Sequence, residues 1–374
     1  MKLVASISQG LENEGAKELI ELGAQSVKAS RRHISFEADM ACLYRLHLRA
    51  RLSFRFLREI ARFPCNGPYE LYSGVQRSID WENWLQPRTS FRVDVTGFSE
   101  GLSHTHFTAL QVKNAIIDLQ RELWGVRSNI DLSNPGICFH LHLANNQAVF
   151  SVDGSNSSLH KRGYKPAVGI APIKETLAAG LMRMTEWDGT SNLVDPLCGS
   201  GTFLIEAVSS LLGHSSGLDR KFLFKNWPDF DTSIWEKELK MAKKIKPLTK
   251  KLPKIVGCEV DEMIAHSASD NVRKAGLDNY IEIINCPFQK FQLPSGLGLL
   301  ICNPPYGKRI GDENELPNLY KALGEYCKTH ASGWDLWLLN GNPKLSKHLG
   351  MKASRRFQVN NGSIDCRWLN YEIR

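Results

Sequence analysis

The sequence lacks several patterns that would assign it to particular classes of protein. Its nine cysteines show no C-x-x-C spacing, which argues against a disulfide framework and against a zinc site. It has no apolar run of membrane-spanning length, and Met1–Ser6 lacks the longer apolar core of a signal peptide. We therefore expect a cytoplasmic protein with no metal site and no membrane partner.

The chain carries a slight excess of positive charge. The 374 residues include 47 lysines and arginines against 39 aspartates and glutamates, which gives a formal net charge of +8. This excess suits an anionic partner such as nucleic acid, although many unrelated soluble proteins have a similar one. The length suffices for two or three domains, each with a sizeable core.

A glycine-containing turn has the features of a small-molecule contact. It lies between the apolar run Leu193–Val194 and the apolar segment Phe203–Val208, and reads Asp195-Pro196-Leu197-Cys198-Gly199-Ser200-Gly201-Thr202. This order predicts strand, loop and helix, with the loop at the carboxyl end of the strand, where open α/β sheets bind ligands. The glycines allow close backbone approach, and the helix start offers unpaired N–H groups.

Two well-known glycine motifs do not fit this turn. A dinucleotide fold requires G-x-G-x-x-G, but Leu204 stands at the third glycine position. A P-loop requires G-K-[ST], where this chain has Gly201-Thr202. A plain structural turn remains an alternative. The pattern D-P-x-C-G-S-G-T instead resembles the nucleoside-binding loop of class I methyltransferases that use S-adenosylmethionine (SAM).

A second motif, Asn303-Pro304-Pro305-Tyr306-Gly307, follows the apolar run Leu299–Cys302. Pro304 restricts the backbone, so the Asn303 amide oxygen and the Pro304 carbonyl are held as a pair of acceptors. Such a pair can bind both N–H bonds of an exocyclic amine and turn its lone pair toward a methyl donor. Tyr306 would stack on the base, worth roughly 1–3 kcal/mol. We predict Asn303, Pro304 and Tyr306 as catalytic residues; a Pro-Pro turn without a chemical role is the alternative.

The two motifs, in this order, resemble the THUMP-domain RNA methyltransferases that modify guanine N2, above all the bacterial 23S rRNA enzymes. His160–Lys165 is similar to the domain junction of that family, and Ala171–Ala178 to its first catalytic-domain helix. Gly341–Pro343, Ser354–Arg356 and Asn361-Gly362 are similar to its closing segment. The resemblance covers nearly the whole chain. It implies SAM as cofactor and RNA as partner, either large-subunit rRNA or its assembly intermediate.

The resemblance also implies the fold. We expect an α/β chain whose C-terminal Rossmann-like class I methyltransferase domain ends in an antiparallel hairpin, preceded by α+β ferredoxin-like and THUMP domains. The expected domains are 1–62, 63–165 and 166–374. A lysine-rich insertion at about 213–253 is either a helical arm over the substrate or a solvated helix. We do not expect the second methyltransferase domain that is fused to some relatives.

One basic segment of the N-terminal region leaves two interpretations open. Met40–Ile60 carries leucines on helical spacing, and its exposed side is rich in arginine: Arg45, Arg49, Arg51, Arg55 and Arg58. A solvated basic face and an RNA contact are both consistent with this pattern.

Cofactor contacts are expected at the ends of several strands. The cofactor would lie beside Asn303 and across the residues of the first loop, namely Asp195, Pro196, Cys198, Gly199, Ser200, Gly201 and Thr202. Glu259 ends the strand 254–259 and can accept both ribose hydroxyls. Asp261 is the alternative, although it also suits a helix N-cap. Pro287 occupies the position of the family's adenine-binding aspartate, so we expect Asn285 or backbone groups to bind adenine, or looser binding.

RNA contacts are expected at basic residues in two regions. The predicted residues are His160, Lys161, Arg162, Tyr164, Lys165, Lys308, Arg309, Arg355 and Arg356. Other activities remain open, because an N-P-P-Y motif can serve any exocyclic amine or amide. They are guanine-N2 methylation of tRNA, adenine-N6 methylation of nucleic acid and methylation of a protein glutamine. A weakly catalytic, RNA-binding ribosome assembly factor is a further alternative, which the departure at Pro287 keeps open.

Overall fold

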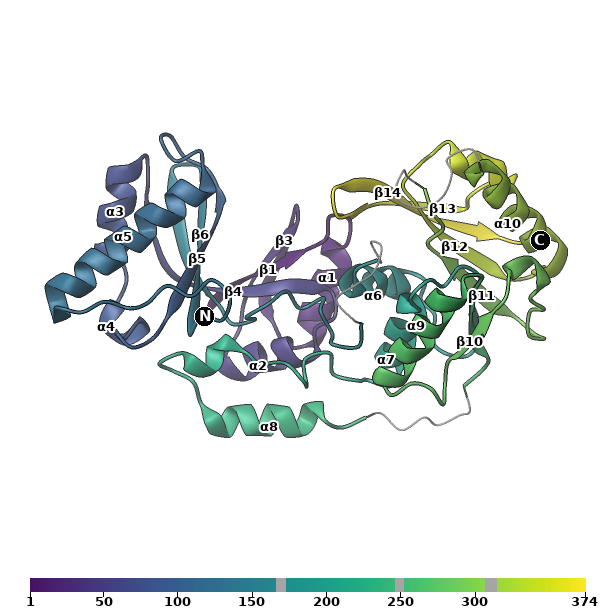
Figure 1. The fold of residues 1–374 in the computed structure, drawn as a ribbon, viewed down its shortest axis with the longest axis horizontal. Helices are drawn as coiled ribbons and strands as arrows, with labels where there is room; N and C mark the ends of the chain where they lie inside the picture. Colours follow the sequence, from purple (N-terminus) through teal and green to yellow (C-terminus); the bar gives the residue numbers. More distant parts are fainter. Residues whose placement is uncertain (166–172, 246–251, 307–314) are drawn as a thin grey trace.

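The chain folds around two seven-stranded sheets in an elongated molecule; the N-terminal sheet extends from the left end to the middle of the view and the C-terminal sheet lies on the right (Figure 1). A computed structural model describes residues 1–165, 173–245, 252–306 and 315–374. The elements of the N-terminal half are β1 (Lys2–Ile7), α1 (Glu12–Glu21), β2 (Gln25–Ser30), β3 (His33–Glu37), α2 (Met40–Arg49), β4 (Ser53–Pro64), α3 (Pro68–Arg77), α4 (Trp81–Trp84), β5 (Phe91–Gly97), α5 (Thr105–Trp124), β6 (Ile137–Ala144) and β7 (Gln147–Asp153).

The elements of the C-terminal half include three short 3-10 helices, labelled η. They are α6 (Glu175–Met184), β8 (Asn192–Asp195), α7 (Thr202–Leu211), η1 (Leu223–Asn226), α8 (Thr232–Ala242), β9 (Ile255–Glu259), α9 (Glu262–Lys274), β10 (Glu282–Asn285), η2 (Phe288–Lys290), β11 (Gly298–Cys302), α10 (Leu316–His330), β12 (Asp335–Asn340), η3 (Leu345–Leu349), β13 (Arg355–Asn361) and β14 (Ile364–Glu372). Within the described ranges, no helix is both long enough and apolar enough to cross a membrane.

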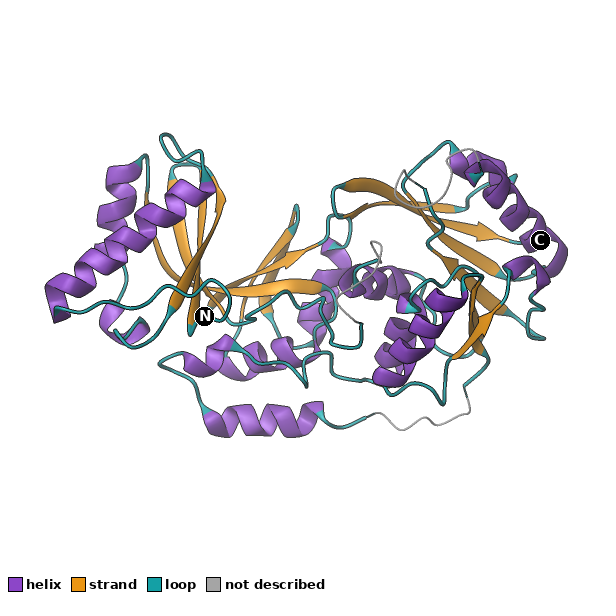
Figure 2. Ribbon diagram, viewed as in Figure 1, coloured by secondary structure: helices purple, strands orange, loops and turns teal. Residues whose placement is uncertain are grey.

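A single long strand joins the first two domains. Strand β4 spans 12 residues. Its first half pairs with β1, as in Leu3↔Arg58, and its second half pairs with β7, as far as Pro64↔Gln147. The sheet therefore runs without interruption in the order β2-β3-β1-β4-β7-β6-β5. Since β4 continues through the expected boundary at residue 62, the two domains share one sheet (Figure 2).

The helical spacing expected over Met40–Ile60 is wrong for its second half. Helix α2 begins after Asp39, whose side chain caps it by accepting from the Cys42 N–H at 2.7 Å, and it ends at Arg49. From Ser53 the chain is a strand held by partners on both sides. Leucine spacing is local, whereas pairing with β1 and β7 is set by distant segments, so the strand overrides the helical pattern.

The C-terminal sheet has the strand order β10-β9-β8-β11-β12-β14-β13. Strands β10, β9, β8, β11 and β12 are parallel, while β14 is antiparallel to both β12 and β13. The expected terminal hairpin is therefore present, with Gly362 at φ +66° in its turn. Helices α6, α7 and α9 lie on one side of this sheet and α10 on the other (Figure 1). Chain order reverses between β8 and β11, which places a ligand crevice at their carboxyl ends.

The described part of the lysine-rich insertion, residues 213–245, packs against the N-terminal domain. We call this segment the arm. Its aromatic side chains contact Tyr44 of α2, with ring centroids 4.9 Å away for Phe224 and 5.7 Å for Trp235. Arg45 of α2 pairs with Glu238 of α8 at 2.7 Å. The arm is therefore not a purely solvated helix: its described part straps the C-terminal half to the N-terminal domain, and a position over the substrate stays a prediction.

Candidate active site

The first predicted loop connects β8 to α7 as expected from the sequence. Gly199 has φ +51° and Gly201 has φ +75°, a conformation that side chains with a Cβ rarely adopt. A Cβ built on Gly199 meets no atom within 4 Å, so the backbone faces open space there. Gly201 is the N-cap of α7 and supplies no side-chain cap, which leaves N–H groups at the helix start for a ligand.

Glu259 holds this loop directly. One carboxylate oxygen accepts from the Gly199 N–H at 3.1 Å, and the other accepts from the Asp261 N–H at 3.0 Å. Each oxygen retains a lone pair for a ribose hydroxyl. Asp261 instead caps α9, because its Oδ1 accepts from the Ile264 N–H at 3.0 Å. The geometry thus favours Glu259 over Asp261 as the ribose acceptor, and both assignments stay predictions.

Asp195 lies beneath the loop, with only 1% of its surface exposed. Burial raises its pKa well above the ordinary value, and the nearby charge of Glu259 acts in the same direction. Its Oδ1 accepts from the Leu197 N–H at 3.1 Å, which fixes the turn that follows β8. Asp195 therefore shapes the loop from the inside. A bond from the Asn271 side chain to the Ser200 carbonyl, at 3.1 Å, supports the loop from α9.

Asn285 braces the ends of two strands. Its side-chain amide donates to the Glu259 carbonyl at 2.9 Å and to the Val260 carbonyl at 3.1 Å. Both amide hydrogens are thus used within the protein, and only Oδ1 remains to accept from an adenine amino group. Pro287 precedes η2 with φ −65° and has no side-chain acceptor. Adenine binding by Asn285 or nearby backbone groups remains a prediction.

Asn303 lies directly after β11, whose register with β8 pairs Leu300 with Val194. Its Oδ1 is buried and has no hydrogen-bond partner among the described residues. A buried polar oxygen without a partner costs free energy, so this oxygen is available to accept from a bound N–H group. The motif and the loop therefore lie at the carboxyl ends of adjacent parallel strands, where the sequence predicted them.

Tyr306 is tied to the terminal hairpin. Its hydroxyl accepts from the Asn361 side-chain amide at 2.8 Å, and a Cβ built on Gly341 would lie 2.6 Å from its ring. Burial raises its pKa, so the phenol stays protonated and cannot act as a general base near neutral pH. Its stacking on a base stays a prediction. The sequence did not predict the hydrogen bond between Asn361 and Tyr306. The only local indication was that Asn361 lies in a predicted hairpin turn.

A hollow of about 500 Å³ adjoins the motif. Its lining comes from the motif, from the start of α10 and from η2: Gln289, Pro305, Glu315, Leu316, Asn318, Leu319 and Ala322. Its volume lies within the range of small-molecule pockets, roughly 300–1,000 Å³.

Two residues of the basic run at the domain junction are held inside the protein. Arg162 donates to the Leu159 carbonyl at 2.6 Å and lies 3.6 Å from Glu206. Tyr164 is buried and donates to Glu206 at 3.2 Å. Arg162 and Tyr164 therefore tie the halves of the chain together internally; their burial disfavours an RNA contact, which stays a prediction.

The two lysines of this run differ in exposure. Lys165 lies 3.7 Å from Glu175 and donates to the Ile173 carbonyl, so it too is used internally. Burial, followed by the charge of Lys174, lowers the pKa of His160 to about 4, which leaves this histidine neutral. Lys161 is exposed, and its RNA contact remains a prediction.

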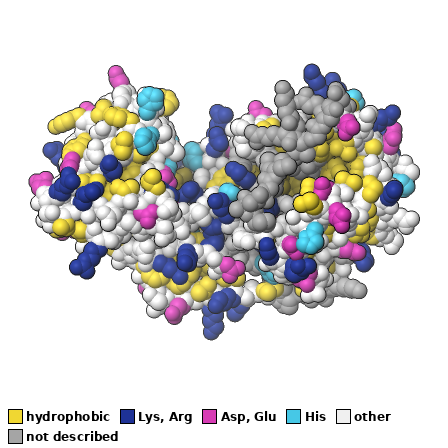
Figure 3. Space-filling model, in the orientation of Figure 1, with side chains coloured by type: hydrophobic (Ala, Val, Ile, Leu, Met, Phe, Trp, Pro, Cys, Tyr) yellow, Lys and Arg dark blue, Asp and Glu magenta, His cyan; other side chains and the backbone are white. Residues whose placement is uncertain are grey.

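The other predicted RNA residues fall into two groups. Arg355 and Arg356 are exposed on β13, at the edge of the C-terminal sheet, so their role stays a prediction. Lys308 and Arg309 lie outside the described residues. Figure 3 shows that Lys and Arg side chains occur around the hollow between the two lobes of the molecule.

Comparison with known proteins decides the family. The RMKL-like methyltransferase domain model matches residues 162–370, which include both motifs. The chain belongs to this methyltransferase family. The RlmL ferredoxin-like domain model matches residues 2–57, and the THUMP domain model matches residues 70–153. The expected three-part fold is thus confirmed, with a class I methyltransferase domain at its C-terminal end.

Relatives and solved structures agree with this family. The chain is 40% identical over 370 residues to slr0064 of Synechocystis sp., provisionally named an RNA methyltransferase, and covers 96% of that protein. It is 37% identical to the ribosomal RNA large subunit methyltransferase K/L of Syntrophotalea carbinolica. That alignment spans 100% of this chain and 54% of the relative, about half of its length.

A solved structure extends the likeness to the cofactor. SMU.472, determined as a complex with S-adenosylhomocysteine (SAH), has a TM-score of 0.89 at 27% identity, covering 100% of this chain and 98% of that one. Together with the class I fold and the family match, this confirms SAM as the cofactor.

Proposed function

We propose that this methyltransferase transfers a methyl group from SAM to the exocyclic N2 amine of a guanosine in 23S rRNA. The observation that carries the chemistry is the buried Oδ1 of Asn303, which has no partner among the described residues. It lies at the end of β11, next in the sheet to the strand that carries the glycine loop. The THUMP domain and the names of the K/L relatives support large-subunit rRNA as the substrate.

The chain's own residues would act by positioning rather than by acid–base catalysis. Gly199 offers an open backbone surface to the cofactor, and Glu259 offers carboxylate oxygens to its ribose. When bound, SAM supplies an electrophilic methyl group on its sulfonium. Asn303 Oδ1 and the Pro304 carbonyl would accept the two amine hydrogens, which directs the nitrogen lone pair at that methyl. Fixing both reactants in this way lowers the activation barrier. The contribution can reach roughly 7–11 kcal/mol for well-oriented reactants.

The protonated Tyr306 fits this scheme. It cannot take a proton near neutral pH, and the scheme requires no base before transfer. Its hydroxyl is held by Asn361 and its ring packs beside Gly341, so the aromatic wall is fixed before a base arrives. The methylated amine would lose its proton to solvent after transfer.

The test is methyl transfer from labelled SAM to three purified pools, each from cells lacking this protein: large-subunit rRNA, small-subunit rRNA and tRNA. Nucleoside analysis then identifies the product. We expect N2-methylguanosine in large-subunit rRNA alone. Label on adenosine or in tRNA would overturn the proposed base or substrate, and SAM binding with no label in any pool would favour an assembly factor.

A further inference from the structure

Both strands of the terminal hairpin hold the side chain of Tyr306. Asn361, the last residue of β13, donates its side-chain amide to the Tyr306 hydroxyl at 2.8 Å, and the Cys366 thiol of β14 donates to the same oxygen at 3.7 Å. At the ring itself, a Cβ built on Gly341 would lie 2.6 Å from two ring carbons, so glycine leaves the room that the ring needs. The position of this ring is therefore set by segments outside β11, the strand that carries the motif.

The hairpin in turn lies against the ferredoxin-like domain, at residues 9–11 between β1 and α1 (Figure 1). We call this segment the docking loop. The Asn360 N–H donates to the Gln9 carbonyl at 3.0 Å. Gly10 has φ +92°, and a Cβ built on it would overlap the Gln358 carbonyl oxygen. Strand β13 therefore rests directly on the backbone of the docking loop, and any side chain at position 10 would displace it.

The docking loop is fixed by further contacts of its own. Glu12, at the start of α1, accepts from the Gly10 N–H at 2.7 Å and from the Arg32 N–H at 2.9 Å. Leu11 is fully buried, and a Cβ built on Gly180 of α6 would overlap one of its methyl groups. The loop is thus packed on the methyltransferase domain through α6 as well as through β13.

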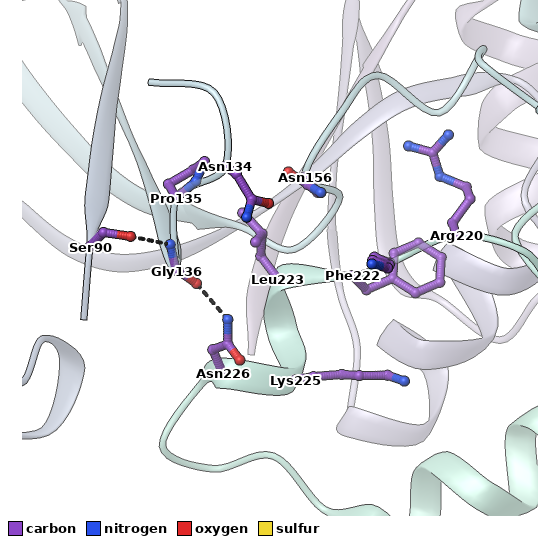
Figure 4. Close-up of a pocket in the computed structure, with 11 residues that line it drawn as sticks. Ser90, Asn134, Pro135, Gly136, Asn156, Arg220, Phe222, Leu223, Lys225 and Asn226 are labelled. Atoms are coloured by element: carbon purple, nitrogen blue, oxygen red, sulfur yellow. Dashed lines mark hydrogen bonds between the residues drawn. The ribbon is translucent and has the colours of Figure 1, made fainter. Parts of the chain in front are cut away.

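The N-terminal half is also joined to the rest of the chain away from this loop. Arg183 of α6 lies 3.1 Å from Glu14 of α1. Asn226 of the arm donates to the Gly136 carbonyl of the THUMP domain at 2.8 Å, beside the pocket drawn in Figure 4. These contacts hold the domain that carries the docking loop, so the loop gives the hairpin a fixed surface.

We propose that Asn361 is a positioning residue for methyl transfer, which acts through the Tyr306 hydroxyl, and that the docking loop holds the strand that carries Asn361. The inference rests on the proposed function, since it requires the Tyr306 ring to stack on the base that accepts the methyl group. A ring held at its hydroxyl and along one edge fixes the plane of that base. Transfer between two bound groups is sensitive to such placement, and a shift of about 1 Å can lower the rate roughly 10²-fold.

The first test is a double-mutant cycle between Asn361 and Tyr306 in the full-length protein. Asn361→Ala removes the amide donor, and Tyr306→Phe removes its acceptor while keeping the ring. Each should lower kcat roughly three- to tenfold, as for one hydrogen bond, with unchanged SAM affinity and unchanged KM for the RNA. The double variant should be no slower than the slower single variant, because both changes remove the same contact. Losses that multiply would overturn the role of Asn361.

Asp365→Ala is the matched control within the hairpin. It removes the 2.7 Å hydrogen bond from the Asn360 side chain to Asp365, which also crosses from β13 to β14. Successive side chains of a strand point to opposite faces, so this bond lies on the face away from Asn361. We expect wild-type kcat for Asp365→Ala, and a loss equal to that of Asn361→Ala would overturn the specific role of the Tyr306 contact.

The second test compares two glycines of the ferredoxin-like domain. Gly10→Ala places a Cβ against β13, whereas a Cβ on Gly23, at φ +98°, meets the end of the Arg45 side chain at 2.9 Å. Both variants carry similar backbone strain, and both are assayed well below their unfolding temperatures. Gly10→Ala should lower kcat at least about threefold through the displaced hairpin, and Gly23→Ala should keep the wild-type value. Equal kcat in the two variants would overturn the role of the docking loop.

A measurement without substrate separates this inference from the proposed function. Fluorotyrosine labels all nine tyrosines, and Tyr306→Phe identifies the fluorine NMR signal of Tyr306. Asn361→Ala and Gly10→Ala should shift this signal, while Asp365→Ala and Gly23→Ala should leave it in place. An unshifted signal in the first two variants would overturn the inference. Methylation of a base other than guanine by the wild-type protein would overturn the proposed function alone, and the kinetic comparison then uses that base.

Discussion

Asn303 shows how one atom can carry a function. Its Oδ1 is buried at the end of β11, and the described part of the protein gives it no hydrogen-bond donor. Folding has therefore left an acceptor unsatisfied at the place where the sequence predicts an amine to bind. Such a group costs roughly 1–3 kcal/mol when it stays unpaired, which a bound N–H donor would recover.

Asn303→Ala should remove most methyl transfer and little cofactor binding. Loss of one preorganised polar contact to the reacting group typically lowers kcat by roughly 10²–10³. SAM affinity should stay near wild type, because the loop at Gly199 and Glu259 is untouched. Single-turnover transfer to rRNA and calorimetric titration with SAM measure the two effects. Asn303→Asp keeps an Oδ1 acceptor and should retain more activity; normal methylation by Asn303→Ala would refute the role of this residue.

Asp195 illustrates the opposite case, a charge that burial disfavours. Its pKa is raised, so the folded state holds the proton more tightly than the unfolded state. The stabilising contribution of the protonated carboxyl is complete below the unfolded pKa, about 3.9, and is lost as pH rises through the folded value. At pH values above the unfolded pKa, the raised pKa of Asp195 therefore lowers the stability of the protein.

Asp195→Asn should raise thermal stability at high pH. Asparagine keeps the acceptor for the Leu197 N–H and carries no charge. The variant therefore avoids the loss of folding stability that wild type shows as pH rises. We expect a gain in Tm of about 2 °C or more at pH 8, shrinking toward pH 5. Scanning calorimetry across this range measures it. A gain independent of pH would mean that the buried charge is not the cause.

At the scale of elements, the sequence predicted the positions of those loops and turns that a local pattern of residues can encode. The loop after β8, the motif after β11 and the hairpin turn at Gly362 each combine a periodic apolar run with glycine or proline, so their positions were predictable. The place of Glu259 at a strand end beside the loop followed from a general rule about parallel strand ends, whereas its bond to the Gly199 N–H was not predicted. In contrast, the bond from Asn361 to Tyr306 joins distant segments and has no local signature.

The internal contacts of the junction run could not be predicted for the same reason. Lysine, arginine and tyrosine close together suggest a surface for RNA, but Arg162 and Tyr164 contact Glu206, which comes from a helix about 40 residues later in the chain. An acid inside an apolar helix gave no sign that Arg51, Arg162 and Tyr164 would converge on it. Burial of a charged group is decided by its tertiary partner, which composition does not reveal.

Glu206→Gln should therefore destabilise the protein strongly. Glu206 is 1% exposed and lies 2.9 Å from Arg51, so removing its charge leaves buried guanidinium groups without compensation. The expected loss is about 3 kcal/mol in the free energy of unfolding, measured by denaturant titration. Glu21→Gln removes the exposed partner of Arg183 and should cost less than about 1 kcal/mol. Equal losses in the two variants would contradict the assigned role of burial.

At the scale of the whole molecule, three connections hold the RNA-binding and catalytic parts together. Strand β4 makes the ferredoxin-like and THUMP domains one sheet. Glu206 links the helix after the cofactor loop to the N-terminal half, and the arm packs on α2. The fold thus fixes the separation between the THUMP domain and the site at Asn303, which suits a large structured substrate better than a free nucleoside.

Trp235→Ala tests whether the arm sets this geometry. Trp235 is buried against Tyr44 and Phe224 and lies under the ammonium of Lys225, 4.6 Å from its ring centroid. Truncation should cost about 3–5 kcal/mol locally. We expect faster hydrogen exchange across α8, a KM for rRNA several-fold higher, and an unchanged SAM affinity. Met241→Ala, on the exposed side of the same helix, should change none of these. If exchange across α8 rises while the KM for rRNA stays at the wild-type value, the arm contributes stability alone and plays no part in holding the substrate.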